Sequence, residues 1–390
     1  MSNTNLPINP LVLKWARETA GINVVELAIR MKKDKKTIMQ WEAGETSPTY
    51  PQLEKLAYTI LKRPLALFFF PEPPKELNPK KSFRTLPETE IENLSPYFLK
   101  LFRQAQAMQI NLGELNENIN PSNKKILNDI EVTKDSDYFE IADKIRSYLG
   151  ISLAKQKLIK NTDEAFKIWR NRIESCGIFI FKEAFKNDQI SGFCIYDLVF
   201  PIIYINNSMP KTRQVFTLFH ELAHLLFKTG GIDKNNDEYL KYLPNNEKKI
   251  EIFCNKIAAE TLVPNKDFQK LSNKIQISEI TISALADSYC VSREVILRKF
   301  LELNFIDSED YKFYTEKWTN QFKYKNKTSK SGGDYYATKA VYLGENYLSL
   351  AFSRYYQNKI TQDQLAGYIG IKADRVLNIE PFLFKKGAVL

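Results

Sequence analysis

The sequence predicts a multidomain α+β protein, and three observations lead to this fold class. Its 390 residues are too many for one ordinary hydrophobic core. The middle third contains short apolar segments with the composition of strands, and helical periodicity precedes and follows them. Strands gathered in one region with helices around them are typical of α+β folds. We therefore expect an all-α domain, then an α+β domain with a small sheet, then a helical C-terminal region.

The composition indicates a globular chain and favours an anionic partner. Apolar residues make up 44% and charged residues 26%, which argues against wholesale disorder. The net charge of +10 is consistent with binding to nucleic acid. The apolar patch at 64–71 is too short to cross a bilayer, and the polar N-terminus does not resemble a signal peptide. We expect a cytoplasmic protein with reduced cysteines and no membrane partner.

Residues 1–71 are predicted to form a domain of short helices with short connections. Asn23 and Asp34 each stand where a helix N-cap is expected, and Gly44 provides the turn to the next helix. The apolar side chains expected to form the core of the two capped helices are Leu27, Ala28, Met31, Ile38 and Trp41.

This segment, residues 22–57, resembles the Xre/Cro helix-turn-helix domain of phage-type repressors. The resemblance implies that double-stranded DNA is a partner and that the second helix enters its major groove. The N-terminal face of that helix carries the candidate DNA-binding residues Lys35, Lys36, Thr37 and Gln40. Lysine and glutamine suit guanine and adenine edges, respectively. Alternatively, the lysines form a solvated basic face or contact phosphate alone.

A connector and two further helices are predicted to follow. Residues 72–134 are predicted to be a linker and helical connector, with one amphipathic helix at 95–120. Its expected apolar positions are Phe98, Leu101, Phe102, Ala105, Met108 and Ile110. Two further helices are predicted near 138–149 and 164–176.

The period then changes from helical to extended. Residues 177–181, 192–197 and 201–206 are predicted to be short strands. Residues 209–228 return to a helix, with Pro210 near its first turn. One hypothesis is that the strand at 201–206, just before this helix, is an edge strand that holds an extended substrate. Its imperfect alternation fits a strand buried on both faces nearly as well.

Histidine occurs twice in the chain, as His220 and His224, with Glu221 between them. Residues four apart share one face of a helix, so both imidazoles can bind one metal ion. Glu221 can reach a water molecule at that ion. In zinc peptidases with this motif, the metal activates the water and the carboxylate accepts its proton. The motif therefore predicts a metalloendopeptidase with Glu221 as the catalytic residue.

The alternative is a buried helix with two ordinary core histidines. The predicted helix is apolar on nearly all sides, which predicts that it is buried. Its apolar residues are Phe216, Leu218, Phe219, Leu222, Ala223, Leu225, Leu226 and Phe227. Buried imidazoles and a buried carboxylate need partners, and a metal ion provides them.

A third protein ligand is needed, and it must be a carboxylate. Phe227 and Gly230 occupy the positions of glycine and histidine in the extended motif HExxHxxGxxH, which excludes that motif. The acidic candidates downstream are Asp233, Asp237, Glu238, Glu247, Glu251 and Glu260. Glu251 is favoured because it lies in the middle of a helix predicted at 246–263, with Ala258 and Ala259 allowing close approach. Glu260 is the second choice, and Glu247 is expected to be a solvated first-turn acid.

Two segments, "RQVFTLFHELAHLLF" and "EIFCNKIAAETLVP", resemble the ImmA/IrrE metallopeptidases. The third ligand of that family opens the pattern ExxxNxxAAxxLxP, which makes it Glu251 here. The resemblance implies a zincin-like domain, a small sheet with the HExxH helix. We expect one zinc ion per chain, with manganese as a substitute. Ala223 stands where the family often has glycine, and no histidine remains to stabilise an oxyanion, so a tyrosine, an arginine or the metal alone must do so.

The predicted domain boundaries are 1–71 for the helix-turn-helix domain, 72–134 for the connector, 135–305 for the peptidase domain and 306–390 for the helical C-terminal region. The resemblance implies a protein substrate, an Xre-type repressor whose cleavage derepresses genes after stress or in a mobile element. The alternative is a DNA-binding regulator or antitoxin-like protein that uses the peptidase fold as a sensor or scaffold. The intact HExxH motif favours the enzyme, because a scaffold has no use for Glu221.

Overall fold

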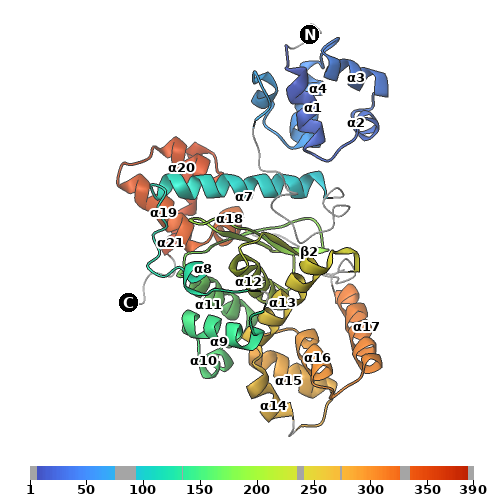
Figure 1. Ribbon diagram of the computed structural model, residues 1–390. Coiled ribbons are helices and arrows are strands. Elements are labelled where there is room, and N and C mark those ends of the chain that lie inside the picture. Colours follow the sequence, from blue (N-terminus) through green and yellow to red (C-terminus); the bar gives the residue numbers. More distant parts are fainter. Residues whose placement is uncertain are drawn as a thin grey trace. The chain divides into compact units, whose positions relative to one another are not determined.

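The computed structural model describes residues 7–74, 94–133, 135–234, 241–272, 275–325 and 334–384 (Figure 1). The chain divides into two compact units, Met1–Ala107 and Met108–Leu390. Residues 75–93 of the predicted connector lie outside the described residues. None of the helices that the structure describes is long and apolar enough to span a membrane.

The first unit consists of short helices around one core. They are α1 (Pro10–Glu18), α2 (Val24–Met31), α3 (Lys35–Ala43), α4 (Tyr50–Glu54), the π-helix η1 (Lys55–Leu61) and the 3₁₀-helix η2 (Leu65–Phe69). All of them bury apolar side chains in the same cluster. The longer helix α7 (Pro96–Leu115) begins in this unit and ends in the second one.

The local signals in this unit act as predicted. The side chain of Asn23 accepts a hydrogen bond from the Glu26 amide at 2.9 Å, and Asp34 accepts one from Thr37 at 2.6 Å. Gly44 ends α3 with a φ of 76°, a conformation that favours glycine. The five side chains predicted to form the core of α2 and α3 are all buried. Both N-cap predictions are therefore confirmed.

The second unit is built around a mixed four-stranded sheet. Its strands are β1 (Phe179–Glu183), β2 (Ile190–Ile195), β3 (Ile202–Asn206) and β4 (Gly231–Lys234), in the order β1-β3-β2-β4. β3 runs parallel to β1 and antiparallel to β2, and β2 is antiparallel to β4. The three predicted strands are confirmed. β4 was not predicted, because its four residues include only one large apolar side chain.

Helix α12 (Lys211–Leu226) packs on one face of this sheet, against β2, β3 and β4 (Figure 1). Two other helices, α11 (Thr162–Glu174) and α13 (Asn245–Leu262), flank it. The ring of Trp169 on α11 meets that of Phe219 on α12 edge to face, with centroids 4.9 Å apart. Helix α13 in turn packs against α9 (Tyr138–Leu149). The helices predicted for this region are thus present within a few residues of the expected bounds.

On the opposite face of the sheet, the C-terminal helices pack over β1. Helix α18 (Tyr335–Leu343) packs on β1, and Tyr347 of α19 (Glu345–Tyr356) meets Phe181 edge to face at 5.3 Å. The remaining helices are α8 (Ile126–Asp129), α10 (Leu153–Lys157), α14 (Asn265–Ser272), α15 (Glu279–Tyr289), α16 (Arg293–Glu302), α17 (Ser308–Lys325), α20 (Gln362–Ile369), η4 (Ala373–Ile379) and α21 (Pro381–Phe384). The sheet therefore has two packed faces, and the C-terminal region completes one of them.

One predicted core position in α7 is wrong. Ile110 is 64% exposed, whereas the other five predicted apolar positions are buried. The buried stripe continues instead through Leu112 and Leu115, which keep the helical spacing from Met108. The helix also ends at Leu115, before the expected residue 120.

Candidate metal centre

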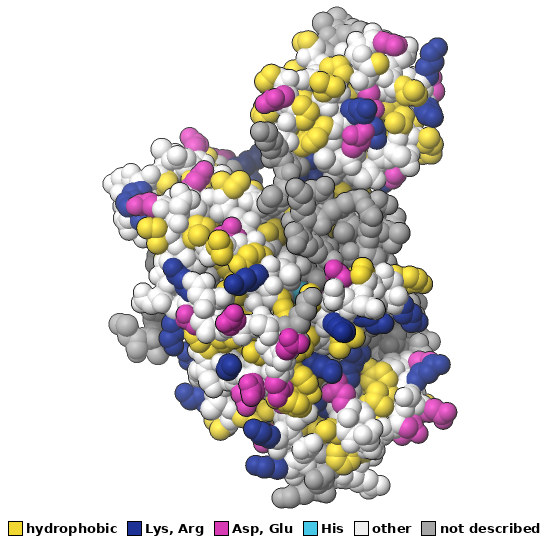
Figure 2. Space-filling view, in the orientation of Figure 1, with side chains coloured by type: hydrophobic (Ala, Val, Ile, Leu, Met, Phe, Trp, Pro, Cys, Tyr) yellow, Lys and Arg dark blue, Asp and Glu magenta, His cyan; other side chains and the backbone are white. Residues whose placement is uncertain are grey.

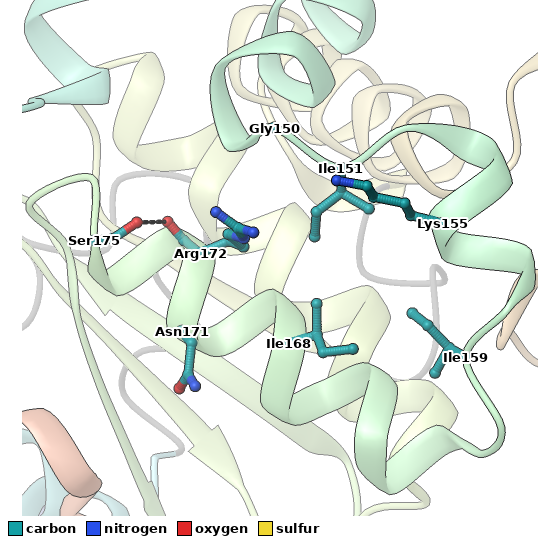
Figure 3. Close-up of a pocket in the computed structure, with 8 residues that line it drawn as sticks. All are labelled: Gly150, Ile151, Lys155, Ile159, Ile168, Asn171, Arg172 and Ser175. Atoms are coloured by element: carbon teal, nitrogen blue, oxygen red, sulfur yellow. Dashed lines mark hydrogen bonds between the residues drawn. The ribbon is translucent and has the colours of Figure 1, made fainter. Parts of the chain in front are cut away.

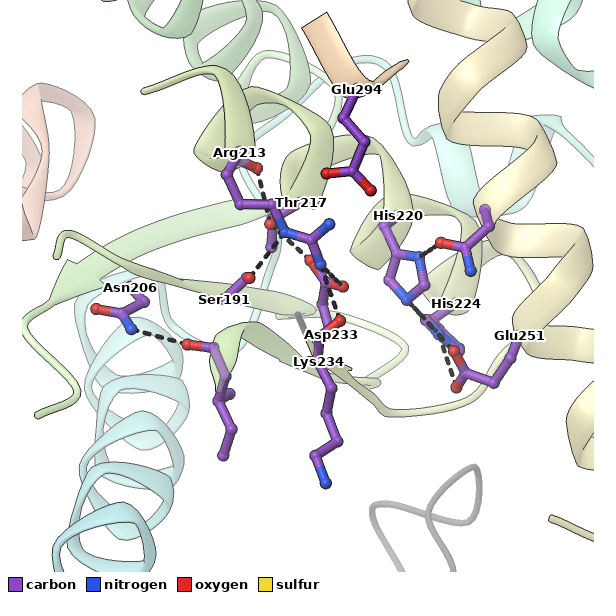
Figure 4. A network of polar contacts seen from close by, with 12 residues as sticks. Ser191, Asn206, Arg213, Thr217, His220, His224, Asp233, Lys234, Glu251 and Glu294 are labelled. Carbon is purple, nitrogen blue, oxygen red and sulfur yellow. Dashed lines mark hydrogen bonds and ion pairs between the residues drawn. The ribbon is translucent and has the colours of Figure 1, made fainter. Parts of the chain in front are cut away.

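Helices α12 and α13 bring two imidazoles and one carboxylate to a single point (Figure 4). The Nε2 atoms of His220 and His224 are 3.1 Å apart. The carboxylate of Glu251 places Oε2 3.5 Å from His220 Nε2 and Oε1 3.3 Å from His224 Nε2. All three side chains are buried, and their ligand atoms lie within 4.8 Å of one another. No other such group of three or more histidine, cysteine or acidic residues occurs in the described part of the chain.

The chemistry of this group fits a divalent cation. Two imidazole nitrogens and a carboxylate oxygen are the donors of a His₂Glu zinc site, which leaves a fourth position open. Burial of His220 opposes its protonation, but the carboxylates of Asp233 and Glu251 outweigh this and raise its pKa to about 9. Burial would raise the pKa of Glu251, but the two imidazoles outweigh it and lower that pKa. The surroundings therefore favour positive charge at this point, and a metal cation provides it.

Close packing around the histidines explains how the elements meet. On α13, Cys254 and Ala258 are buried small side chains that let the helix approach α12. Gly231 at the start of β4 lies against the imidazole of His224: an added Cβ would stand 2.5 Å from its Cδ2. Only a residue without a side chain allows this contact, so Gly231 lets β4 pack against the helix that carries the two histidines.

Glu221 lies on the same helix, fully buried. Neither of its carboxylate oxygens has a hydrogen-bond partner with normal geometry among the described residues. Burial raises its pKa, although the two histidines oppose the shift. A buried carboxylate next to the two histidines is placed to take a proton from a water molecule.

Asn255 holds the ring of His220 from the side away from the cluster. Its Oδ1 lies 3.0 Å from Nδ1 of His220. Because Nε2 faces the cluster, Nδ1 carries the proton and donates to Asn255. Asn255 follows Glu251 by one helical turn, so one face of α13 contacts His220 at both ring nitrogens. Sequence reasoning missed this role, although the i, i+4 spacing from Glu251 was a signal for it.

Replacing Asn255 with leucine is expected to weaken zinc binding by about 10–100-fold, because the His220 ring loses the acceptor that orients it. Asn255→Asp keeps an acceptor at the same place and should restore most of the affinity. The measurement is competition with a chromogenic zinc chelator, with thermal unfolding as the check on folding. Equal zinc affinity in the leucine variant and the natural protein would exclude this role for Asn255.

Other candidate third ligands have different partners. Asp233 on β4 accepts a hydrogen bond from Thr217 at 2.6 Å and pairs with Arg213 at 2.5 Å (Figure 4). Glu260 forms a buried ion pair with Lys299 at 2.7 Å. Glu247 lies in the first turn of α13, outside the cluster. The candidates Asp237 and Glu238 fall outside the described residues. Among the described candidates, only Glu251 joins the histidines.

The candidate DNA-binding residues lie in the first unit, on the first two turns of α3. Lys35 and Lys36 are exposed, and Thr37 and Gln40 are half-buried. Lys32 and Lys33, in the turn before α3, are also exposed. Figure 2 shows one face of the molecule with its lysines and arginines coloured dark blue. The N-terminal end of α3 thus presents a basic surface.

Comparison with known families concerns the second unit. Residues 173–301 match the family model of the IrrE N-terminal-like domain, Peptidase_M78. The match contains α12 and α13 and so includes the whole histidine and glutamate cluster. Comparison with curated proteins finds no match. This third of the chain is therefore similar to a peptidase family, and its buried cluster is compatible with metal binding.

Proposed function

We propose that the protein is a zinc-dependent endopeptidase, with manganese as a substitute metal. The observation that carries this proposal is the convergence of His220, His224 and Glu251 beside the buried carboxylate of Glu221, within the peptidase-like segment. Held by His220, His224 and Glu251, a zinc ion would supply a Lewis acid for a water molecule and a peptide carbonyl. Glu221 accepts the proton of the attacking water and returns it to the leaving amine.

The order of the strands favours β4, and not the strand at 201–206, as the edge that an extended substrate joins. β3 is paired on both sides, by β1 and β2, so it has no free edge for a substrate. β4 pairs with β2 on one side, and no strand of the described residues pairs with its other side. It also contacts His224 through Gly231. We place an extended substrate along β4, where main-chain hydrogen bonds add it to the sheet.

A peptide library derived from a proteome tests both statements. Zinc-loaded protein should generate new peptide N-termini by mass spectrometry, metal-stripped protein should not, and added zinc should restore cleavage. A cleaved peptide that is N-methylated at one backbone amide beside the cleavage site should then bind about tenfold more weakly, because it loses one main-chain donor. If every N-methylated peptide binds as well as the unmodified one, the position of the substrate along β4 is excluded, while the peptidase activity is not.

We further propose that the first unit binds double-stranded DNA through α3 and that the substrate is a transcriptional repressor. The net charge of +10 and the exposed lysines before and on α3 support the DNA partner. A DNA-binding unit in the same chain would bring the peptidase to proteins bound at DNA. The competing function is a DNA-binding regulator whose peptidase fold is a sensor or scaffold. DNA binding without any cleavage by zinc-loaded protein would favour that function.

Replacing Lys35 and Lys36 together with alanine is expected to weaken DNA binding and to reduce the slope of log affinity against log salt by about 2. Each lysine that neutralises a phosphate contributes about one counterion to that slope. Fluorescence anisotropy with labelled duplex DNA at several salt concentrations measures both effects. Lys14→Ala, an exposed lysine on α1, serves as the control. An unchanged slope in the double variant would show that this face of α3 does not contact DNA.

A further inference from the structure

A pocket of about 480 Å³ lies in the second unit, on the outer side of α11 (Figure 3). Its apolar lining comes from Ile151, Ile159 and Ile168. Ile151 is buried and the other two are half-buried. This volume falls within the range of small-molecule sites, which are commonly apolar with a few polar groups at the rim.

Two cations face the same space. Lys155 on α10 and Arg172 on α11 extend toward one another from opposite sides of the pocket (Figure 3). No aspartate or glutamate is among the residues that line it. Both residues are exposed, and an anion placed between them would be attracted by two cations. Asn171 also lines the pocket, but its amide points away from the two cations (Figure 3).

We propose that this pocket binds an organic anion, a carboxylate, sulfonate or phosphate group carried on an apolar body. The isoleucines hold the apolar body, and Lys155 and Arg172 hold the anionic oxygens. A purely apolar ligand would have no interaction with the two cations. A free inorganic anion would leave the isoleucines in contact with water.

The position of the pocket connects it to both helices of the metal centre. Gly150 at its rim ends α9, which packs against α13, the helix of Glu251. The opposite wall is α11, which packs against α12, the helix of the two histidines. A bound anion would therefore contact the supports of both helices, while its binding does not depend on metal or on peptidase activity.

The test compares two fluorescent probes with the same apolar body. 8-Anilinonaphthalene-1-sulfonate carries a sulfonate, and N-phenyl-1-naphthylamine is its uncharged analogue. We expect the sulfonate to bind the full-length protein with a Kd of about 10–100 μM and the uncharged analogue at least about tenfold more weakly. Equal affinities for the two probes, or no binding of the sulfonate, would overturn the proposal.

Variants assign the binding to this pocket. Lys155→Glu combined with Arg172→Glu should weaken the sulfonate at least about tenfold and leave the uncharged analogue unchanged. Ile168→Trp should weaken both probes by filling the space. The matched control is Lys249→Glu with Lys256→Glu, which reverses two lysines of a second apolar pocket on α13. Loss of sulfonate binding in this control, with retention in the first pair, would place the ligand elsewhere.

Discussion

Replacing Glu221 with glutamine is expected to leave one zinc per chain in place and to lower peptide cleavage by about a thousandfold or more. Glutamine has nearly the same shape as glutamate, so the packing around residue 221 of α12 is preserved. Its amide cannot accept the proton of the attacking water. Both carboxylate oxygens of Glu221 are buried, and the thiol of Cys194 is the side chain that interacts with them besides the two histidines.

The measurement combines metal analysis with cleavage of a peptide found in the library. Glu247→Gln makes the same chemical change in the first turn of α13 and should leave both quantities unchanged. Glu251→Gln should lose the metal as well as the activity, because Glu251 is the proposed third ligand. Full activity in Glu221→Gln would exclude Glu221 as the general base. Metal loss in the same variant would make it a ligand instead.

A second large effect is expected at Lys182, a buried lysine on β1. Its side chain is 2% exposed, and its Nζ lies 4.4 Å from the centre of the Phe166 ring. Burial, followed by the nearby charges of Lys211 and Arg170, lowers the pKa of Lys182 to about 6. The charge of Asp163 only partly opposes this shift. Near neutral pH the folded protein must therefore hold this amine largely uncharged, whereas the unfolded chain protonates it.

Replacing Lys182 with methionine is expected to increase the free energy of unfolding by about 2–5 kcal/mol at pH 7. The folded pKa is depressed, so the unfolded chain binds more protons between about pH 6 and pH 10.5. The destabilisation by Lys182 is thus complete below about pH 6 and fades as the pH rises to 10.5. The advantage of the methionine variant should shrink over the same range.

Urea unfolding at several pH values between 6 and 10.5 measures this difference directly. Lys144→Met changes an exposed lysine on α9 and should alter stability by less than about 0.5 kcal/mol at every pH. A constant difference between Lys182→Met and the natural protein at all pH values would show that the folded state does not perturb this amine.

Local interactions along the chain are the part of this protein that the sequence by itself determined. The pairing of His220 with His224 follows from residues four apart on one helix. The caps at Asn23 and Asp34 depend on a hydrogen bond to an amide three residues later. The choice of Glu251 rested on its position within a helix bearing small residues, and the structure brings this residue to the histidines. The first two contacts are local or follow from helical periodicity, whereas the contact of Glu251 with the histidines joins two helices, α12 and α13.

Strand order and burial depend on contacts between distant segments, and only the tertiary structure decided them. The four apolar residues of β3 cannot show whether this strand lies at an edge or at the centre of the sheet, because that depends on where β1 and β2 pair. β4 has too few apolar residues for a strand signal, and it forms through pairing with β2 and contact of Gly231 with His224. Lys182 resembles a surface lysine in the sequence, yet helices from other parts of the chain bury it. Periodicity reports which face of an element is apolar, whereas the neighbours that cover that face are set by the free energy of packing the whole unit.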